Sequence, residues 1–246
     1  MKVLFLGLFM FFSCASFAQD IHLSEYNYTV PDIARRGLTK ERIFAGMERK
    51  FIKLGSSICS NRALLWANDF KRQYGINTAK LFLFYSEKTG EAGDKVWWYH
   101  VTPLVNENGQ LWALDAGFPS FVKTPLLPEA WLHKFAGSGT CKEIKQGEDD
   151  LIALMYTQRR FPSTTRYGTH DCYYRITSDP YWTPGTVAQN LLQRNSQGQP
   201  LNFYRDSIQP EELMQACVEA STTPIGGFLS RPKKKCRQYL GLPEED

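Results

Sequence analysis

The chain has 246 residues, and its 29 Lys and Arg against 25 Asp and Glu give a formal net charge of +4. Hydrophobic residues make up 43% and charged residues 22%, close to the averages for globular proteins. This composition excludes a disordered tail protein, a collagen, a coiled coil and a polytopic membrane protein, and the length allows one ample core. The small positive charge gives no reason to expect a nucleic-acid partner.

The first residues have the pattern of a secretory signal. Lys2 precedes an apolar run over residues 3–12 that is too short to span a bilayer, and small residues follow at Ser16 and Ala18. We therefore expect residues 1–18 to be a signal peptide, and the mature protein to be secreted or periplasmic with no stable membrane association. A membrane anchor and a lipoprotein site at Cys14 are the alternatives.

The cysteines after Ala18 are odd in number. They are Cys59, Cys141, Cys172, Cys217 and Cys236. An oxidising compartment favours disulfides, and because the last four form two local pairs in the sequence we predict the disulfides Cys141–Cys172 and Cys217–Cys236. Cys59 is then left as a free thiol and is a candidate nucleophile.

The predicted helices begin with one capped by Thr39 that runs to about Leu54. A second runs from about residue 58 to Tyr74, with Ser57 as a plausible cap and Gly75 as the stop signal. Further helices are expected over residues 128–135, 185–194 and 210–220.

The predicted strands cover residues 80–85, 96–105, 110–115 and 173–176. Residues 106–109, Asn-Glu-Asn-Gly, indicate a hairpin between the second and third strands, and Pro103 favours an edge or bulged position. Helices and strands do not alternate regularly, which indicates an α+β fold. We expect a catalytic domain over residues 19–180 and a C-terminal extension over residues 181–246 packed on the same domain.

Cys59 is predicted in the first turn of a helix, where backbone N–H groups and the helix dipole stabilise a thiolate. The same N–H groups point to where an oxyanion would form, so Ser57 and Ile58 are candidate oxyanion residues. The structural alternative is an inert buried cysteine. The helix position and the odd cysteine count favour a nucleophile.

The hairpin predicts a partner for His100. If residues 106–109 form the loop, His100 lies directly opposite Asp115, so a carboxylate can accept from the histidine Nδ1–H. If the turn is only Asn108-Gly109, Asp115 stays on the same face, one diagonal away. Either register leaves the other ring nitrogen for Cys59, as in a nucleophile–base–orienter triad. The structural alternative is an ordinary buried histidine that has a hydrogen-bond partner.

The strand periodicity places Trp98, His100 and Thr102 on one face, and Trp97, Tyr99 and Val101 on the other. We predict Trp98 at the wall of a catalytic groove and Trp97 in the core. The candidate substrate contacts are Trp98, Tyr99 and Thr102.

Several short segments resemble the secreted bacterial protein-glutaminase (protein-glutamine deamidase) family. They are Cys59-Ser-Asn-Arg-Ala63, Trp98-Tyr-His-Val101 followed by Leu104-Val105, Leu114-Asp115, and Tyr173-Tyr-Arg175 with Ser178. The resemblance covers roughly residues 55–180. It implies a papain-like and transglutaminase-like core, with an antiparallel sheet packed against helices and the nucleophile at a helix N-terminus. It also implies a triad of Cys59, His100 and Asp115.

The implied reaction is deamidation of protein-bound glutamine through a thioester, with no cofactor and no metal. The chain departs from the family in having Ala116 where a proline is usual, and in leaving no room for a separate pro-domain between Ala18 and Cys59. We expect the C-terminal stretch, which has no counterpart in the family, to cover or shape the groove.

Three alternative functions would use the same candidate residues. A transglutaminase would pass the thioester to lysine, a papain-like peptidase would cleave the backbone, and a non-catalytic exported binding module would use Cys59 and His100 structurally. The basic stretch around Cys236 is expected to be a solvated face in preference to a patch for acidic partners.

Overall fold

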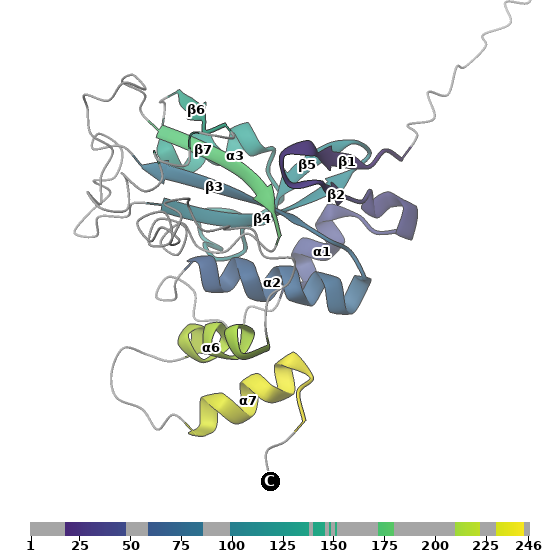
Figure 1. The fold of residues 1–246 in the computed structure, drawn as a ribbon, viewed down its shortest axis with the longest axis vertical. Helices are drawn as coiled ribbons and strands as arrows, with labels where there is room; N and C mark the ends of the chain where they lie inside the picture. The colour runs from purple at the N-terminus through teal and green to yellow at the C-terminus, as the bar shows by residue number, and fades with distance from the viewer. Residues whose placement is uncertain are drawn as a thin grey trace, which may run out of the picture.

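The computed structural model describes residues 18–47, 59–85, 99–137, 140–145, 148, 151, 172–179, 210–221 and 230–243. At the centre of this part of the chain is a mixed sheet with the strand order β5-β4-β3-β7-β6, in which only β6 and β7 run parallel (Figure 1). Its strands are β3 (Ala79–Tyr85), β4 (Tyr99–Glu107), β5 (Gln110–Ala113), β6 (Cys141–Glu143) and β7 (Cys172–Ser178).

Every residue of the central strand β3 is buried, because helices cover both faces of the sheet. Phe82 and Phe84 point towards α2 (Cys59–Tyr74) and share a cluster with Ala63 of that helix. The intervening side chains, Leu81 and Leu83, pack on the opposite face against α3 (Pro128–Ala136). This is the period-two alternation of a strand between two apolar layers.

The N-terminal part of the described chain lies against one end of the sheet (Figure 1). It contains a small antiparallel pair, two single-turn 3₁₀ helices and one α-helix: β1 (Ile21–Leu23), η1 (Ser24–Tyr26), β2 (Tyr28–Val30), η2 (Ile33–Arg36) and α1 (Lys40–Gly46). The Thr39 side chain accepts from the Arg42 N–H at 3.2 Å, which confirms the predicted N-cap.

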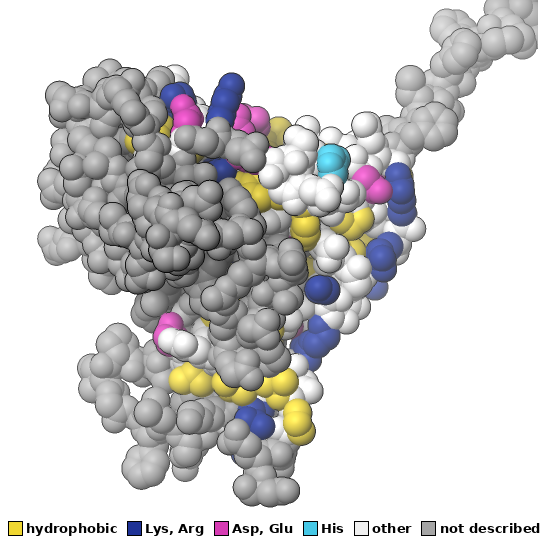
Figure 2. All heavy atoms as spheres, viewed as in Figure 1, with side chains coloured by type: hydrophobic (Ala, Val, Ile, Leu, Met, Phe, Trp, Pro, Cys, Tyr) yellow, Lys and Arg dark blue, Asp and Glu magenta, His cyan; other side chains and the backbone are white. Residues whose placement is uncertain are grey.

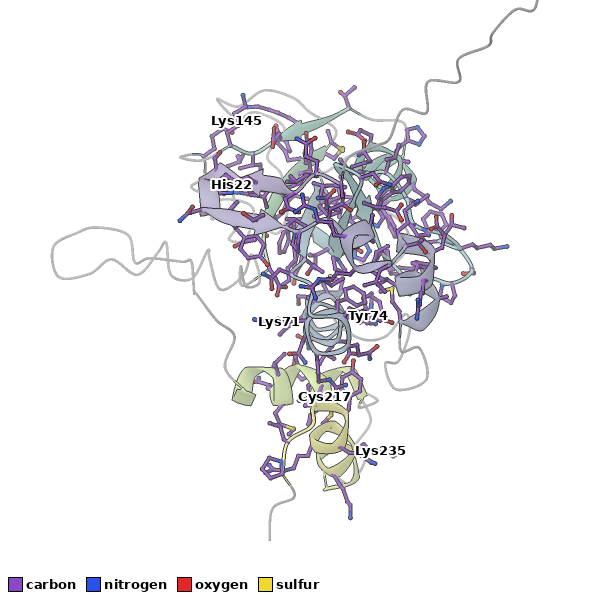
Figure 3. All side chains as sticks on the ribbon, turned by 90° about the vertical axis from the view of Figure 1, so that its right-hand side faces the viewer. His22, Lys71, Tyr74, Lys145, Cys217 and Lys235 are labelled. Carbon is purple, nitrogen blue, oxygen red and sulfur yellow. A yellow bond between two sulfur atoms is a disulfide. The ribbon has the colours of Figure 1, made fainter. Side chains whose placement is uncertain are left out.

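The C-terminal helices α6 (Pro210–Ser221) and α7 (Ser230–Leu240) pack beneath α2, on the side away from the sheet (Figures 1 and 3). The Cys217–Cys236 disulfide joins them inside the core that they share with Trp66 and Phe70 of α2. The second disulfide joins Cys141 of β6 to Cys172 of β7. Two disulfides are typical of a protein that folds in an oxidising compartment.

The α+β class is confirmed, and the predicted end of the first helix is wrong. The first helix ends at Gly46 and not near Leu54, because Met47 adopts an extended conformation with φ −60° and ψ 126°. The hairpin has a two-residue turn, Asn108-Gly109, with both residues at positive φ.

Pro103 lies in β4 at the residue where the pairing with β5 has ended, so that side of the strand is an edge there, as predicted. It is tolerated there because β5 pairs with β4 only up to Leu104, so the proline nitrogen falls just outside that ladder. The predicted helix over residues 185–194 lies outside the described residues.

Basic and acidic side chains both occur on the face shown in Figure 2, with Lys and Arg spread down one side of the described surface. The basic stretch around Cys236 belongs to α7, a helix that the sequence analysis did not predict, and Lys234 and Lys235 are exposed on it. Among the described residues no helix is long and apolar enough to cross a membrane.

Candidate active site

Cys59 begins α2, the helix that covers one face of the sheet. Its side chain is partly exposed, and its thiol is outside both disulfides. The first backbone N–H groups of a helix have no partner within the helix, so the N–H of Cys59 is a donor next to its own thiol. The predicted oxyanion residues Ser57 and Ile58 lie outside the described residues.

Cys59 lies beside an uncovered edge of β4. The strand β5 covers β4 only from Leu104 onwards, and the last bond across this edge runs from the Leu114 N–H to the Pro103 carbonyl at 3.0 Å. Carbonyls two and four residues earlier in a strand point in the same direction, so that of Tyr99 also faces this edge. The Cys59 Sγ lies 4.0 Å from the Tyr99 carbonyl oxygen, next to His100.

His100 and Asp115 form a buried contact. The His100 Nε2 donates to the Asp115 Oδ2 at 2.7 Å, and the exposed fractions of the two side chains are 0% and 1%. The hairpin has the second of the two predicted registers, so Asp115 follows the end of β5 and lies diagonally across from His100.

The ring nitrogen that contacts Asp115 differs from the prediction. Sequence reasoning assigned Nδ1 to the carboxylate, whereas the structure uses Nε2, the nitrogen farther from the backbone, because the diagonal position of Asp115 demands a longer reach. The Cys59 side chain also helps to raise the pKa of the His100 ring. Asp115 contacts Nε2, so Nδ1 is the other ring nitrogen, and it is buried.

Aromatic rings enclose the histidine. Trp131 of α3 stacks on His100 with ring centroids 5.1 Å apart, and Phe118 and Phe135 approach at 5.3 and 4.6 Å. The Trp131 Nε1 also donates to the Asp115 Oδ2 at 3.1 Å, and the Gly117 N–H donates to Oδ1 at 3.2 Å. The carboxylate is therefore fixed by three donors in a site that these rings shield from water.

Inside this aromatic enclosure, the charges of His100 and Asp115 stabilise each other. Burial lowers the pKa of His100, but the Asp115 charge, its hydrogen bond and the Cys59 side chain outweigh burial and raise that pKa to about 9. Burial likewise raises the pKa of Asp115, but His100, the Trp131 N–H and the Arg62 charge hold that pKa below its ordinary value. Below about pH 9 the pair is therefore an imidazolium and a carboxylate.

This pair predicts a pH dependence of stability. A histidine with a raised pKa contributes stability that is fully present below its ordinary pKa of 6.5, and is lost as the pH rises through about 9. The free energy of unfolding should fall by on the order of 3 kcal/mol between pH 6 and pH 9 from this group alone. Urea titrations of the wild type and His100→Gln measure it, because the variant lacks this component.

The matched control for that series is His133→Gln, which removes an exposed histidine of α3. Its pH dependence should follow the wild type. If the wild type and His100→Gln lost the same free energy of unfolding between pH 6 and pH 9, this would contradict the assigned His100–Asp115 pair.

Of the three predicted substrate contacts, the structure describes Tyr99 and Thr102. Trp98, and with it Trp97, lies outside the described residues. Tyr99 is half-buried and donates from its hydroxyl to the Ser60 Oγ at 3.2 Å, directly beside Cys59. Thr102 is fully buried in β4, on the same face as His100, so its hydroxyl lies in the interior. The roles of these residues towards a substrate stay predictions.

Sequence reasoning did not assign Trp131 or Arg62 to the site. Trp131 lies in the predicted helix over residues 128–135, but nothing in the sequence indicates which strand residue that helix covers. Arg62 gives a clearer signal, because a residue three positions after Cys59 lies on the same side of the helix. It is 2% exposed, and its charge interacts with Cys59 and Asp115.

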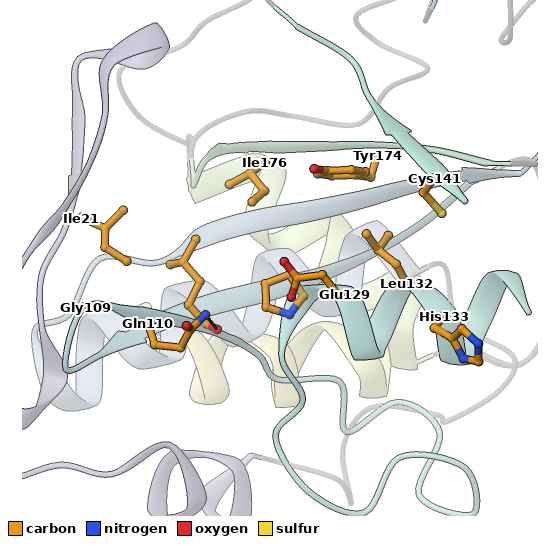
Figure 4. A pocket seen from close by; sticks show the side chains of 11 residues that line it. Ile21, Gly109, Gln110, Glu129, Leu132, His133, Cys141, Tyr174 and Ile176 are labelled. Atoms are coloured by element: carbon orange, nitrogen blue, oxygen red, sulfur yellow. Dashed lines mark hydrogen bonds between the residues drawn. The ribbon is translucent and has the colours of Figure 1, made fainter. Parts of the chain in front are cut away.

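A surface cavity of about 480 Å³ lies on the α3 side of the sheet (Figure 4). Tyr174 and Ile176 of β7 and Glu129, Leu132 and His133 of α3 line it, together with the turn at Gly109. Neither Cys59 nor His100 belongs to this lining. Among the described residues, no group of three or more His, Cys, Asp or Glu side chains is placed to hold a metal.

Comparisons with known proteins give one distant similarity. No protein-family model matches the chain, and no curated protein sequence matches it. Among solved structures, the chain is similar to the NMR structure of protein-glutaminase from Chryseobacterium proteolyticum. The identity is 17%, the match covers 78% of this chain and 86% of that chain, and the TM-score is 0.38.

Proposed function

We propose that this protein is an exported cysteine amidohydrolase that converts protein-bound glutamine to glutamate and releases ammonia. The observation that carries the proposal is the arrangement of a free thiol at the start of α2 beside a buried His100 that donates to Asp115. These are the parts of nucleophilic catalysis: a nucleophile, a proton carrier and a group that orients the carrier.

The choice of a side-chain amide as substrate rests on the sequence motifs. The segment Cys59-Ser-Asn-Arg-Ala63 and the Tyr-His-Val segment around His100 resemble the protein-glutaminases and occur in the same order. The partner is then a protein or peptide with an exposed glutamine. The two disulfides and the signal-like N-terminus support action outside the cytoplasm.

The proposed reaction has two halves. In the first, the Cys59 thiolate attacks the carboxamide carbon, and the His100 imidazolium gives its proton to the departing nitrogen, which leaves as ammonia. The Cys59 N–H, with an N–H from Ser57 or Ile58, would stabilise the oxyanion. In the second half, neutral His100 takes a proton from water, the hydroxide attacks the thioester, and glutamate leaves as the thiol is restored.

The test measures ammonia release from casein together with the mass of the product, with Cys59→Ala as the blank. Deamidation adds about 1 Da per event, because an amide NH₂ is replaced by OH. Ammonia and this mass gain in the wild type, both absent from Cys59→Ala, are the expected result.

The alternatives are distinct outcomes of the same assay. Cross-linked product with ammonia would indicate a transglutaminase, since both reactions share the thioester. New peptide termini would indicate a papain-like peptidase. Absence of any reaction, together with a Cys59 that iodoacetamide does not alkylate, would indicate a binding module.

A further inference from the structure

Arg62 is a buried cation next to the proposed nucleophile. It lies three residues after Cys59 in α2, on the same side of the helix, and only 2% of its surface is exposed. Its guanidinium lies over the Phe118 ring with 5.4 Å between the Cζ and the ring centroid. Burying a charge costs free energy unless opposite charges compensate it, so anionic groups are expected near Arg62.

The Arg62 guanidinium lies close to Gly117, in the loop that carries Asp115. A Cβ added at Gly117 would lie 2.8 Å from the Arg62 Nε, closer than real Cβ atoms come, and 3.2 Å from its Cζ, which is a tight contact. Gly117 is not among the glycines with positive φ, so the backbone itself would accept an alanine there. The space next to Gly117 is therefore taken by Arg62, and the Gly117 N–H in turn donates to the Asp115 Oδ1.

The two charges that interact with this cation are those of the proposed site. Burial lowers the pKa of Arg62, and the charges of Cys59 and Asp115 oppose that lowering. Arg62 thus interacts electrostatically with two groups that are anionic, or become so, in the proposed reaction. His100 interacts with the same two groups.

We propose that Arg62 is a positioning residue whose fixed cation favours the Cys59 thiolate and holds the Asp115–Gly117 loop against α2. The proposal deepens the proposed function, because it assigns a cation to the side of the nucleophile and a support to the loop of the orienting carboxylate. It does not depend on which amide is hydrolysed.

The first test compares alkylation of Cys59 by anionic iodoacetate and by neutral iodoacetamide, with labelling of the Cys59 peptide quantified by mass spectrometry. A local cation speeds the anionic reagent selectively. Arg62→Met should lower the ratio of the iodoacetate rate to the iodoacetamide rate roughly tenfold. Arg62→Lys should keep the ratio within about twofold of the wild type, because it keeps the charge.

The matched control is Arg72→Met, which removes the same charge from the last turn of the same helix, about 20 Å along its axis from Cys59. Its ratio should equal that of the wild type. An unchanged ratio in Arg62→Met would overturn the proposal, since loss of packing alone slows both reagents equally.

A second variant tests the contact if Arg62→Met does not fold. Gly117→Ala should displace the Arg62 guanidinium, and so lower both the iodoacetate-to-iodoacetamide rate ratio and the rate of ammonia release. Adding Arg62→Lys should restore both quantities, because the slimmer lysine leaves room for the new methyl group. Additive losses in the double variant would overturn the proposal. Alkylation needs no glutamine, so a wild type that releases no ammonia would refute the proposed function without deciding this one.

Discussion

Replacing Asp115 by asparagine is expected to lower kcat for ammonia release about 10²- to 10⁴-fold while the chain remains folded. The carboxylate accepts from three donors, the His100 Nε2, the Trp131 Nε1 and the Gly117 N–H. An asparagine has one oxygen for these donors and brings an NH₂ group that must face one of them. The imidazolium formed in the reaction also loses its counter-charge.

The pH profile should change in the same variant. Without the carboxylate, the largest contribution that raises the pKa of His100 to about 9 is gone. Loss of activity at high pH, where His100 can no longer protonate the leaving ammonia, should therefore begin at a lower pH than in the wild type. The measurement is kcat from pH 6 to pH 10 for both proteins.

Asp20→Asn is the matched control, because Asp20 is a carboxylate near the protein surface that pairs with Arg35, away from the site. It should keep the wild-type kcat and pH profile. A folded Asp115→Asn protein with wild-type turnover would remove Asp115 from the triad and leave His100 to act with Cys59 alone.

The pairing of His100 with Asp115 was predictable because strand side chains alternate with a period of two. Both registers of the hairpin placed Asp115 on the face of His100, so the choice between them did not affect the prediction. The register itself depends on the turn at Asn108-Gly109, whose two positive φ values suit a two-residue hairpin. Which ring nitrogen meets the carboxylate depends on a diagonal reach that the sequence does not encode locally.

The aromatic enclosure of His100 was not predictable, because it is a tertiary contact. Trp131 and Phe135 are four residues apart and indicate an apolar helix face, but the strand under that face is fixed only when α3 docks on the sheet. The helix α7 was missed for a different reason. Its stretch contains Pro232, and a proline favours a helix break unless it falls in the first turn, where it is tolerated.

Removing the Cys217–Cys236 disulfide is expected to lower the free energy of unfolding by about 3 kcal/mol. The bond closes a loop with a sequence separation of 19 between α6 and α7. Both cysteines are fully buried, in the core cluster that also holds Trp66 and Phe70 of α2. Urea titration of the variant that carries both Cys217→Ala and Cys236→Ala measures the loss.

The same variant tests how the C-terminal helices are held on α2. Glu219 of α6 accepts from the Asn61 Nδ2 at 2.7 Å, and Tyr239 of α7 donates to Asp69, so polar contacts anchor each helix. These single hydrogen bonds are worth about 1 kcal/mol each, less than the disulfide. We therefore expect hydrogen exchange in α7 to accelerate in the variant, whereas exchange in β3 should follow only the global loss of stability.

Cys236→Ala alone is the control for lost side-chain volume. It removes the covalent link but keeps the Cys217 thiol, so a cross-linking effect predicts nearly the full loss in this single variant. A double variant that unfolds at the wild-type urea concentration would show that packing of α6 and α7 on Trp66 and Phe70 is sufficient without the bond. In that case the contact of α6 with Asn61, two residues from Cys59, would persist in a reducing environment, and the disulfide would have no effect on the environment of the nucleophile.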